Sequence, residues 1–389
     1  MSVSVAGTSA LITDIDRRKA LPIIRSLGRA GVRIIGISYN RFPMGAFSKY
    51  CAKVYHCPDY RDKPDLFLNK LEEICKNEKP DVFYPIEDVV LSLCVQHPDS
   101  WASYTRAVVP TASVLEEAYD KWKTIQFARQ LGVAVPKTYC PESIDEVADL
   151  ASKWQGQAVI KPRKSSGSRG LRYVENPSQI YSVYQEVSGK YPRPLIQERI
   201  PSGGEGLGVF VLLNNKHETL AVFGHKRLRE YPVSGGPSTL RVSYRDDKLI
   251  EQTVRLFKSM GLVGVAMAEY KLDLRINEPV LLEVNPRFWG SLQLAIHAGV
   301  NFPLLYHKTA LALSVEPILD YPIGKCCRWL WPGDILHFLT NPKRFDLQPS
   351  FFKFWDSNVS YDIISADDPL PMLGIVLEGL RKLTRRVSL

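Results

Sequence analysis

The stretch AEYKLDLRINEPVLLEVNPR, residues 268–287, has the pattern of two strands joined by a tight turn. If the turn centres near Ile276, Glu269 and Glu283 face each other across the hairpin. Directly opposed carboxylates between apolar flanks are unfavourable unless a cation offsets their charge. Asn285 projects from the same face as Glu283. Two carboxylates, an amide oxygen and substrate phosphates are a suitable ligand set for Mg²⁺; the alternative is an amphipathic hairpin with one exposed acidic face.

A second segment, VIKPRKSSGSRG at residues 159–170, delivers Lys161 at the end of an apolar strand that breaks at Pro162. Glycines in the basic loop that follows permit backbone amides to turn toward an anion, and serines add donors. The small residues of this loop are Ser165, Ser166, Gly167, Ser168 and Gly170. The loop lacks the GxxxxGK(S/T) pattern and no helix clearly follows. A phosphate-binding loop and a flexible basic hairpin loop therefore both remain open.

The segment LIQERIPSGGEG, residues 195–206, is a strand that leaves into a Gly-rich loop. Glu198 lies at the strand end, and Glu205 follows a glycine pair. Backbone groups at such an edge can meet an adenine ring, and a nearby carboxylate can accept hydrogen bonds from ribose hydroxyls. Gly-rich loops between strands are also common without any ligand.

The segment GHKRLREYPVSGGPSTLR, residues 224–241, places a Gly-rich turn among basic side chains, which are His225, Lys226, Arg227, Arg229 and Arg241. Such a loop can bind an anionic substrate or close over it. The candidate substrate contacts are Arg227, Arg229, Ser234, Gly235 and Gly236. A charged, exposed hairpin is the alternative.

Asp120 and Lys121 begin the helical pattern DKWKTIQFARQLG, with Asp120 as its predicted N-cap. A cation near a helix N-terminus opposes the macrodipole, and an incoming phosphate would relieve that conflict. An ordinary surface lysine is the alternative for Lys121.

The chain divides by pattern into three predicted parts. Residues 1–112 alternate strands and helices, which predicts a parallel α/β sheet. Residues 113–315 begin with a helical stretch, predicted over 113–155, and continue as antiparallel strands of an α+β layer. Residues 316–389 are aromatic and marked by prolines, and we expect a helical element appended to the rest. The first turn, TDIDRR, has no GxGxxG, so a nicotinamide-dependent oxidoreductase loses its main support.

The composition predicts a globular cytoplasmic protein. The chain has 389 residues, 45% of them hydrophobic, and a formal charge of +9. No apolar run approaches the ~20 residues of a membrane helix, and no nucleic-acid-binding motif occurs. The basic C-terminus, GLRKLTRRVSL, suits either weak contact with anionic lipid or a solvated tail. Seven scattered cysteines without a framework pattern favour reduced thiols.

Taken in order, these motifs resemble the ATP-grasp superfamily. The resemblance covers residues 1–315, counting the α/β domain that usually precedes the grasp, and rests on segments in a specific order. These are DK at 120–121, VIKP at 159–162, the Ser/Gly loop at 165–170, QERI with Glu205, AEYK at 268–271 and LLEVNPR at 281–287.

The resemblance implies a role for each motif. Lys121 and Lys161 would contact ATP phosphates, with the 165–170 loop folded over them and a lid spanning about 155–205. The backbone at Glu198, Arg199 and Ile200 would hold adenine, and Glu205 the ribose. Two Mg²⁺ ions, or Mn²⁺, would bind Glu269, Glu283 and Asn285. The catalytic candidates are Arg287, for the transferring phosphoryl group, with Lys161 and Arg227.

The segments RLREYPVSGGPST and NPRFWGS look like the carbamoyl phosphate synthetase-like branch, which includes carboxylate–amine ligases such as D-aspartate ligase. This implies an ADP-forming ligase that activates a small carboxylate as an acyl phosphate and joins it to an amine. A carboxyphosphate-forming enzyme similar to biotin carboxylase and a nucleotide-binding regulatory module are the alternatives. A homodimer is a reasonable expectation.

Overall fold

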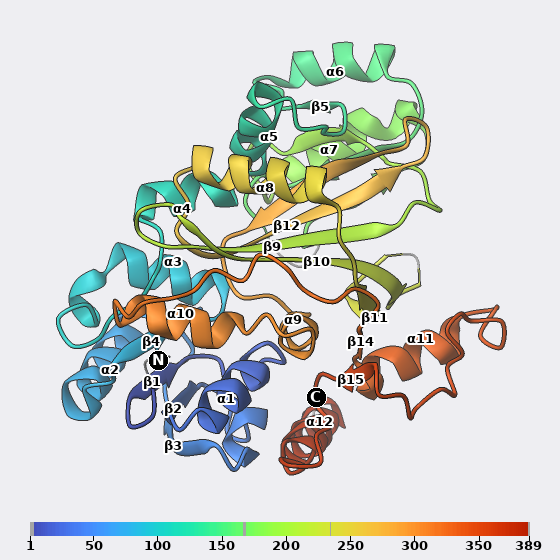
Figure 1. The fold of residues 1–389 in the computed structure, drawn as a ribbon. Coiled ribbons are helices and arrows are strands. Elements are labelled where there is room, and N and C mark those ends of the chain that lie inside the picture. The colour runs from blue at the N-terminus through green and yellow to red at the C-terminus, as the bar shows by residue number, and fades with distance from the viewer. Residues whose placement is uncertain (1–3, 166–168, 234, 388–389) are drawn as a thin grey trace.

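The computed structural model describes residues 4–165, 169–233 and 235–387, with side chains up to residue 379. Three sheets dominate the fold (Figure 1). A four-stranded sheet lies near the N-terminus, a seven-stranded sheet crosses the centre, and a second four-stranded sheet lies beyond it. The expected combination of a parallel α/β part with antiparallel sheets is confirmed.

The N-terminal sheet is parallel, with the order β3-β2-β1-β4. Its elements are β1 (Ser9–Ile12), α1 (Ala20–Arg29), β2 (Arg33–Ser38), β3 (Cys51–His56), α2 (Pro64–Glu78), β4 (Val82–Tyr84) and α3 (Asp88–Gln96). Strand order changes direction between β1 and β4, and in open α/β sheets ligands bind outside the carboxyl ends of strands at such a point. The loops after β1 and β4 are therefore positions of interest.

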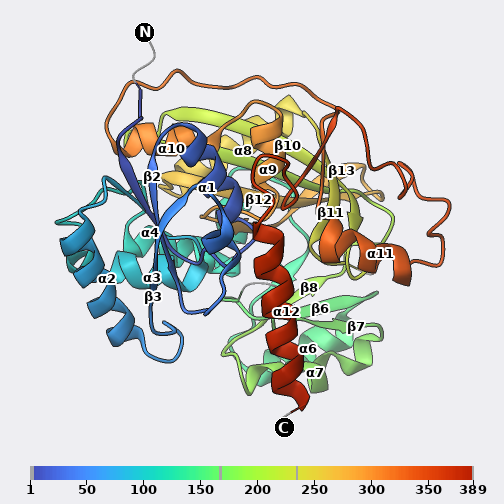
Figure 2. The same cartoon turned by 90° about the horizontal axis from the view of Figure 1, so that it is seen from below.

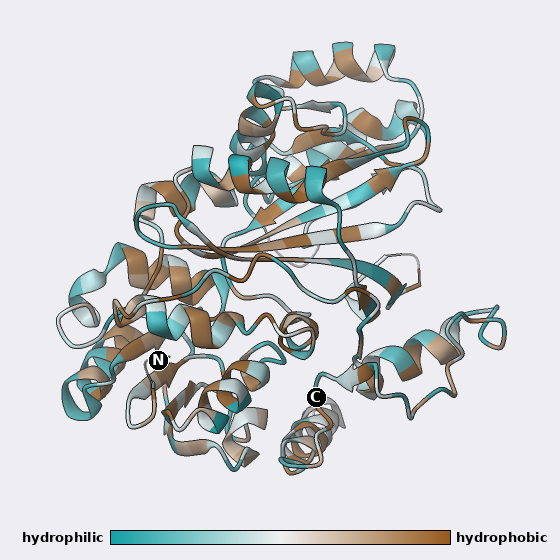
Figure 3. Cartoon of the chain, in the orientation of Figure 1, coloured by the Kyte–Doolittle hydropathy of each residue, from teal (hydrophilic) through white to brown (hydrophobic). Residues whose placement is uncertain are grey.

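The central sheet has the order β13-β12-β9-β10-β11-β14-β15. Its strands are β9 (Gly206–Leu213), β10 (Thr219–Glu230), β11 (Ser238–Ser243), β12 (Gly264–Asp273), β13 (Glu278–Asn285), β14 (Cys326–Arg328) and β15 (Val359–Tyr361). Helix α8 (Asp247–Ser259) packs on β9 and β10, and the side chain of its N-cap Asp246 accepts a hydrogen bond from the Leu249 backbone. Figure 3 shows hydrophobic residues along β9 beneath the hydrophilic outer surface of α8.

The smaller sheet has the order β5-β8-β6-β7. Its strands are β5 (Thr138–Tyr139), β6 (Ala158–Lys161), β7 (Arg172–Val174) and β8 (Leu195–Glu198), covered by α6 (Ile144–Lys153) and α7 (Ile180–Ser188). The predicted helical stretch 113–155 needs correction. It contains β5, and its first part is two helices, α4 (Ala112–Tyr119) and α5 (Lys121–Gln130), because Asp120 is extended and caps α5 as predicted.

The segment after residue 315 does more than append helices. Besides α11 (Ile335–Thr340) and α12 (Pro371–Val387), it adds β14 and β15 to the central sheet. Helix α12 packs against the turn Met44–Phe47 of the N-terminal part (Figure 2). The side chains of its basic end, including Arg381 and Arg385, lie outside the described residues. Across the described part of the chain, no helix combines the length and apolar character needed to cross a membrane.

Candidate active site

The carboxylate hairpin forms in the predicted register. Glu269 of β12 and Glu283 of β13 are direct partners across the antiparallel ladder, so their side chains lie on one face of the central sheet. Asn285 projects from that face as well, and its Nδ2 donates a hydrogen bond to Glu283 Oε1 at 3.0 Å. The predicted opposition of two carboxylates is therefore confirmed.

Glu269 has a cationic partner that the motif did not predict. The guanidinium of Arg227 on β10 forms an ion pair with Glu269 by reaching across β9. It passes over Gly206, where a Cβ would lie 3.0 Å from Arg227 Cδ. Burial raises the pKa of Glu269 even though Arg227 opposes the shift, with Glu283 adding to it. Two carboxylates at this position thus call for further positive charge.

The donor set fits a hard divalent cation. Carboxylate and amide oxygens of Glu269, Glu283 and Asn285 share one face, and oxygen ligands are those that Mg²⁺ prefers. Among the described residues, no group of three or more His, Cys, Asp and Glu is arranged to hold a metal alone. Phosphate oxygens would therefore have to complete such a site.

Two lysines lie beside Glu283, Lys161 buried and Lys121 partly buried. Lys161 ends β6, is 6% exposed, and its Nζ lies 3.4 Å from the Leu282 carbonyl oxygen. Burial lowers its pKa to about 7, with Lys121 acting in the same direction. Lys121 begins α5, and its Nζ lies 4.0 Å from Glu283 Oε2; burial lowers its pKa too. Lys121 lies at the N-terminus of α5, where an anion such as phosphate is favoured, and Lys161 adds a second ammonium group nearby.

The Ser/Gly loop begins against Lys121, whose Nζ donates to the Ser165 carbonyl oxygen at 2.5 Å. Gly170 has a φ of +75°, and a Cβ there would lie 2.6 Å from the Tyr191 ring, so glycine is required. Ser166, Gly167 and Ser168, which the sequence also assigned to the phosphates, lie outside the described residues.

The predicted adenine and ribose residues follow β8. The carboxylate of Glu198 accepts a hydrogen bond from the Lys137 backbone at 2.8 Å, and Arg199 pairs with Glu175. Ile200 is buried. Glu205 is partly exposed, and its Oε1 lies 2.7 Å from Lys226 Nζ.

This loop is pressed onto the central sheet. A Cβ on Gly204 would lie only 1.8 Å from the Leu272 carbonyl oxygen. The Leu272 backbone in turn donates to the Glu205 carbonyl oxygen at 2.9 Å. The glycine pair in the sequence is thus what lets the loop reach β12.

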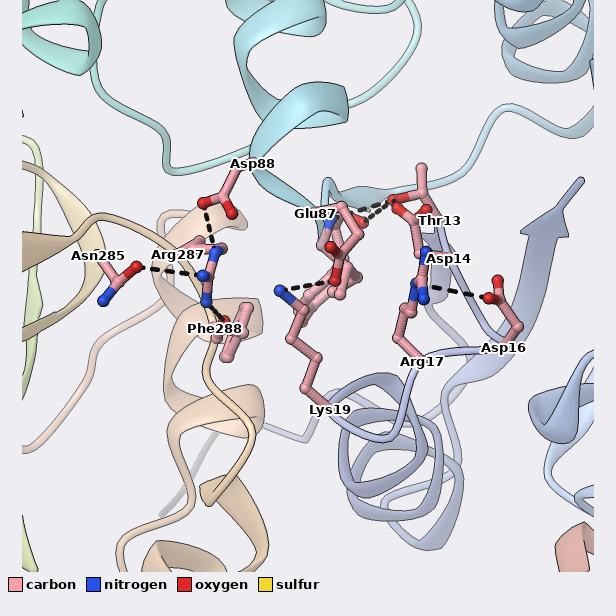
Figure 4. Close-up of polar contacts among 12 residues, drawn as sticks. Thr13, Asp14, Asp16, Arg17, Lys19, Glu87, Asp88, Asn285, Arg287 and Phe288 are labelled. Carbon is pink, nitrogen blue, oxygen red and sulfur yellow. Dashed lines mark hydrogen bonds and ion pairs between the residues drawn. The ribbon is translucent and has the colours of Figure 1, made fainter. Parts of the chain in front are cut away.

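Arg287 connects the hairpin to the N-terminal part (Figure 4). Its guanidinium pairs with Asp88 at the start of α3 and donates to Asn285 Oδ1 at 3.1 Å. Burial acts to lower its pKa, but the carboxylate of Asp88 outweighs that effect and the pKa is raised. Nearby, Lys19 Nζ lies 2.8 Å from Glu87 Oε1.

Sequence analysis missed Lys19, Glu87 and Asp88. All three follow β1 or β4 at the carboxyl end of the parallel sheet, on either side of the point where the strand order changes. That position was the available signal. The candidate site is therefore composite, with the N-terminal part supplying its acidic and basic rim.

The substrate contact predicted for Arg229 needs correction. Arg229 is buried, its Nη1 lies 3.1 Å from Asp334 Oδ2, and its Nη2 donates to the Pro349 carbonyl oxygen. The strand register shifts between Arg227 and Arg229, so Arg229 partners Leu240 and projects from the other face. The structure does not bring it to the site.

The turn after β10 stays close to Arg227. Arg227 Nη1 lies 3.5 Å from the Gly236 carbonyl oxygen, and the Gly236 backbone N–H donates to Glu230 Oε2 at 3.4 Å. Gly235 has a φ of +131°, which only glycine adopts readily. Ser234 lies outside the described residues.

Lysines and carboxylates thus meet where the central sheet and the smaller sheet approach each other, with Lys161 of β6 beside Leu282 of β13. The ATP-grasp domain family matches residues 118–291. These residues are an ATP-grasp domain, and the chain has the fold of the ATP-grasp superfamily.

The chain is similar to parts of several much larger proteins. The chain is 24% identical to acetyl-CoA carboxylase of Dictyostelium discoideum over 187 residues, which cover 46% of this chain and 8% of that protein. It is 22% identical to the multifunctional protein pyrABCN of Emericella nidulans over 332 residues, 79% of this chain and 14% of that protein. The chain thus spans a small part of these relatives.

Solved structures share the fold at low sequence identity. Biotin carboxylase from Campylobacter jejuni superposes with a TM-score of 0.68 at 16% identity, covering 82% of this chain and 74% of that one. The biotin carboxylase domain of 2-oxoglutarate carboxylase from Hydrogenobacter thermophilus, in complex with MgADP and bicarbonate, gives 0.64 at 15% identity over 82% and 73%. L-amino acid ligase from Bacillus licheniformis gives 0.58 at 15% identity over 81% and 75%.

Proposed function

We propose that this protein is an ATP-dependent, ADP-forming ligase that joins a carboxylate to an amine through an acyl phosphate. The observation that carries the proposal is the pair of lysines, Lys121 and Lys161, beside the opposed carboxylates of Glu269 and Glu283. Cations for phosphates and oxygen ligands for a metal meet at one point, which is the arrangement that phosphoryl transfer requires. The likeness to an L-amino acid ligase supports an amino acid or small amine as one substrate.

In this proposal Lys121, Lys161 and the Ser165 loop bind the ATP phosphates. The backbone at 198–200 holds adenine and Glu205 contacts the ribose. Glu269, Glu283 and Asn285 hold two Mg²⁺ ions, for which Mn²⁺ is an alternative. Held by these three residues, the ions would supply positive charge against the ATP phosphates.

Arg287 is proposed to meet the charge that develops on the transferred phosphoryl group as the substrate carboxylate attacks it. Asp88 and Asn285 hold its guanidinium in place, so little reorganisation is needed during the reaction. Arg227 fixes Glu269 and, through Gly236, the turn beside the site. The amine then attacks the acyl carbon, the new C–N bond forms, and phosphate leaves. No protein nucleophile is required.

A carboxyphosphate-forming enzyme is the second candidate, favoured by the likeness to a biotin carboxylase domain bound to bicarbonate. Bicarbonate dependence of ATP turnover separates the two. A regulatory nucleotide-binding module, the third, would turn over no ATP. We further infer three parts, 1–112, 113–315 and 316–389, a cytoplasmic location and a homodimer, with a small acid and a small amine as partners.

The deciding experiment is ADP release from the purified protein with MgATP across a matrix of carboxylates, amino acids and amines, with and without bicarbonate. ADP formed only with a particular acid and amine, in equimolar yield with an amide, supports the ligase. ADP formed with bicarbonate alone supports carboxyphosphate formation. No release with any combination, despite MgATP binding, would contradict both.

A further inference from the structure

Basic side chains gather on the carboxylate-bearing face of the central sheet, two to three strands from Glu269. Arg241 of β11 is the direct partner of Arg227, so both project from this face. His225 lies in the same row as Glu269, because both are partners of Gly208 on β9. His225 and Arg241 are then diagonal neighbours, about 7–8 Å apart at Cα.

Arg241 is fully buried and incompletely neutralised. Its guanidinium pairs with Asp362, but Asp362 also accepts a hydrogen bond from Arg18 at 2.8 Å. One carboxylate thus serves two arginines, which leaves one positive charge in excess. Within the described residues, Nε and Nη1 of Arg241 have no hydrogen-bond partner. Buried guanidinium N–H groups without a partner are strongly unfavourable, and a polar group that reached them would relieve that cost.

His225 presents a second unpartnered group beside it. The ring is 3% exposed and packs against Phe210 at 4.9 Å between ring centroids. No described atom makes a hydrogen bond to either ring nitrogen. Burial lowers the pKa of His225, helped by Arg227 and Arg241, so a neutral imidazole with one N–H donor lies next to the surplus charge.

Gly208 makes this arrangement possible. A Cβ at that position would lie 2.8 Å from His225 Nε2, so any other residue would displace the imidazole from the sheet. Arg18 is likewise held in place, with its guanidinium 3.9 Å over the Trp329 ring. The cluster is therefore assembled from the loop after β1, the central sheet and the segment after residue 315.

The charge and position of the cluster indicate the ligand. One surplus positive charge matches one carboxylate, whereas the phosphates have Lys121 and Lys161 on the other side of Glu269. Adjacent strands are about 4.8 Å apart, so β11 lies roughly 14 Å from β12. A substrate that reacts near Glu269 and Arg287 would therefore direct its far end toward Arg241.

We propose that Arg241, His225 and Arg18 bind a carboxylate of a substrate other than the carboxylate that is phosphorylated. The inference rests on the proposed ligase function, which it makes more specific. The carboxylate belongs to the amine substrate if that substrate is an amino acid, or to the acid if that is a dicarboxylate. Asp362 is a positioning residue that holds both arginines.

Calorimetric titration of the full chain tests this, with Mg²⁺ and a non-hydrolysable ATP analogue present. One arm compares L-amino acids with the corresponding amino-acid amides, which keep the amine and side chain. The other compares the longer dicarboxylates pimelate and suberate with heptanoate and octanoate. We expect a carboxylate-bearing ligand to bind roughly 10- to 100-fold more tightly than its matched analogue. The arm in which this occurs identifies the substrate.

Two variants separate recognition from folding. Arg241→Gln should bring the affinity ratio of the matched pair close to one. His225→Leu, which breaks no ion pair, should reduce the ratio several-fold and carries the test if Arg241→Gln does not fold. Arg344→Gln removes an exposed arginine of the last segment and should leave the ratio at its wild-type value. Unfolding curves of all three are recorded first.

The proposal is overturned if wild-type protein binds none of these ligands or binds both members of every pair equally. It is also overturned if Arg241→Gln and His225→Leu fold and retain the wild-type affinity ratio. ADP release is measured with the same ligands. Release without discrimination would remove this proposal and leave the ligase standing. If the protein prefers the carboxylate-bearing ligands but releases no ADP, the proposed ligase function is wrong and the proposed carboxylate site stands.

Discussion

Two buried clusters of similar composition lie on opposite faces of the central sheet. Each has two arginines and one aspartate: Arg18, Arg241 and Asp362 on the face with the carboxylate hairpin, and Arg229, Arg328 and Asp334 on the other. The two clusters lie on different faces because successive side chains of a strand point to opposite sides of the sheet. Arg241 is opposite Cys327 on β14, and the neighbouring Leu240 is opposite Arg328. The two clusters have the same excess charge.

The protein itself satisfies most of the second cluster. Arg229 donates to the Pro349 carbonyl oxygen at 2.9 Å, and Arg328 lies over the Phe351 ring at 4.5 Å. Asp334 also accepts from Thr239 at 2.8 Å. Among the described residues each cluster keeps two unpartnered guanidinium nitrogens, one on Arg229 and one on Arg328 in the second cluster and both on Arg241 in the first. The clusters differ in where these donors lie: in the first, both belong to one guanidinium and the unpartnered His225 ring lies on the same face, whereas in the second they are divided between two arginines.

The largest effect should come from Glu283 on the site face. Glu283→Gln removes one of two opposed carboxylates, and ADP formation should fall by about 1000-fold, the upper range for removing a group that stabilises transition-state charge. Glu283 is partly exposed, so unfolding should stay cooperative. Steady-state kinetics and urea unfolding measure the two. Unchanged turnover would remove Glu283 from the site.

On the opposite face, Asp334→Asn should lower the stability of the protein and leave its ADP formation unchanged. It leaves Arg229 and Arg328 without a counter-charge, which destabilises by about 3 kcal/mol. ADP formation per folded molecule should not change. Urea unfolding measures the loss of stability, and an ADP-release assay at low temperature, where the variant is folded, measures activity. A loss of turnover without loss of stability would contradict the division between the two faces.

A smaller effect concerns the proton on Lys161. Its pKa of about 7 in the free protein means that the amine is largely neutral at pH 8. Bound phosphates favour the charged form and raise that pKa, so MgATP binding should take up a fraction of a proton at pH 8 and less at pH 6. Titrations in buffers of different ionisation enthalpy measure it.

Lys161→Met should abolish the uptake, and Lys123→Met, on the same helix as Lys121, should not. Proton release on binding, or uptake that persists in Lys161→Met, would assign the low pKa to another group.

The sequence predicts the contacts of the site that lie within one hairpin or helix, but few of those between distant segments. Opposed Glu269 and Glu283 and the cap at Asp120 depend on contacts within a hairpin or helix, so spacing predicts them. The Arg287–Asp88 pair joins residues 199 positions apart, and no local pattern encodes it. Arg229 was misassigned because a register shift turned its side chain over, and sequence periodicity does not reveal a single shift.

The last segment was the least predictable for the same reason. Cys326–Arg328 is a three-residue strand, too short to give a period, and it pairs with β11 from more than 80 residues away. An aromatic, proline-marked sequence favours a helical or loop assignment. Its contribution to the sheet follows only from tertiary pairing.

The pairing of β14 with β11 has a consequence for how such enzymes can be redesigned. Because Asp362 follows β15 directly, the last segment supplies the counter-ion of Arg241, whereas Lys121 and Lys161, the lysines proposed to bind phosphates, belong to α5 and β6. In the proposed function, nucleotide binding and substrate choice would then depend on different segments of the chain. If the proposed ligase function holds, grafting the final segment of a homologue, together with the matching β10–β11 turn, should change the substrate without altering Lys121 and Lys161.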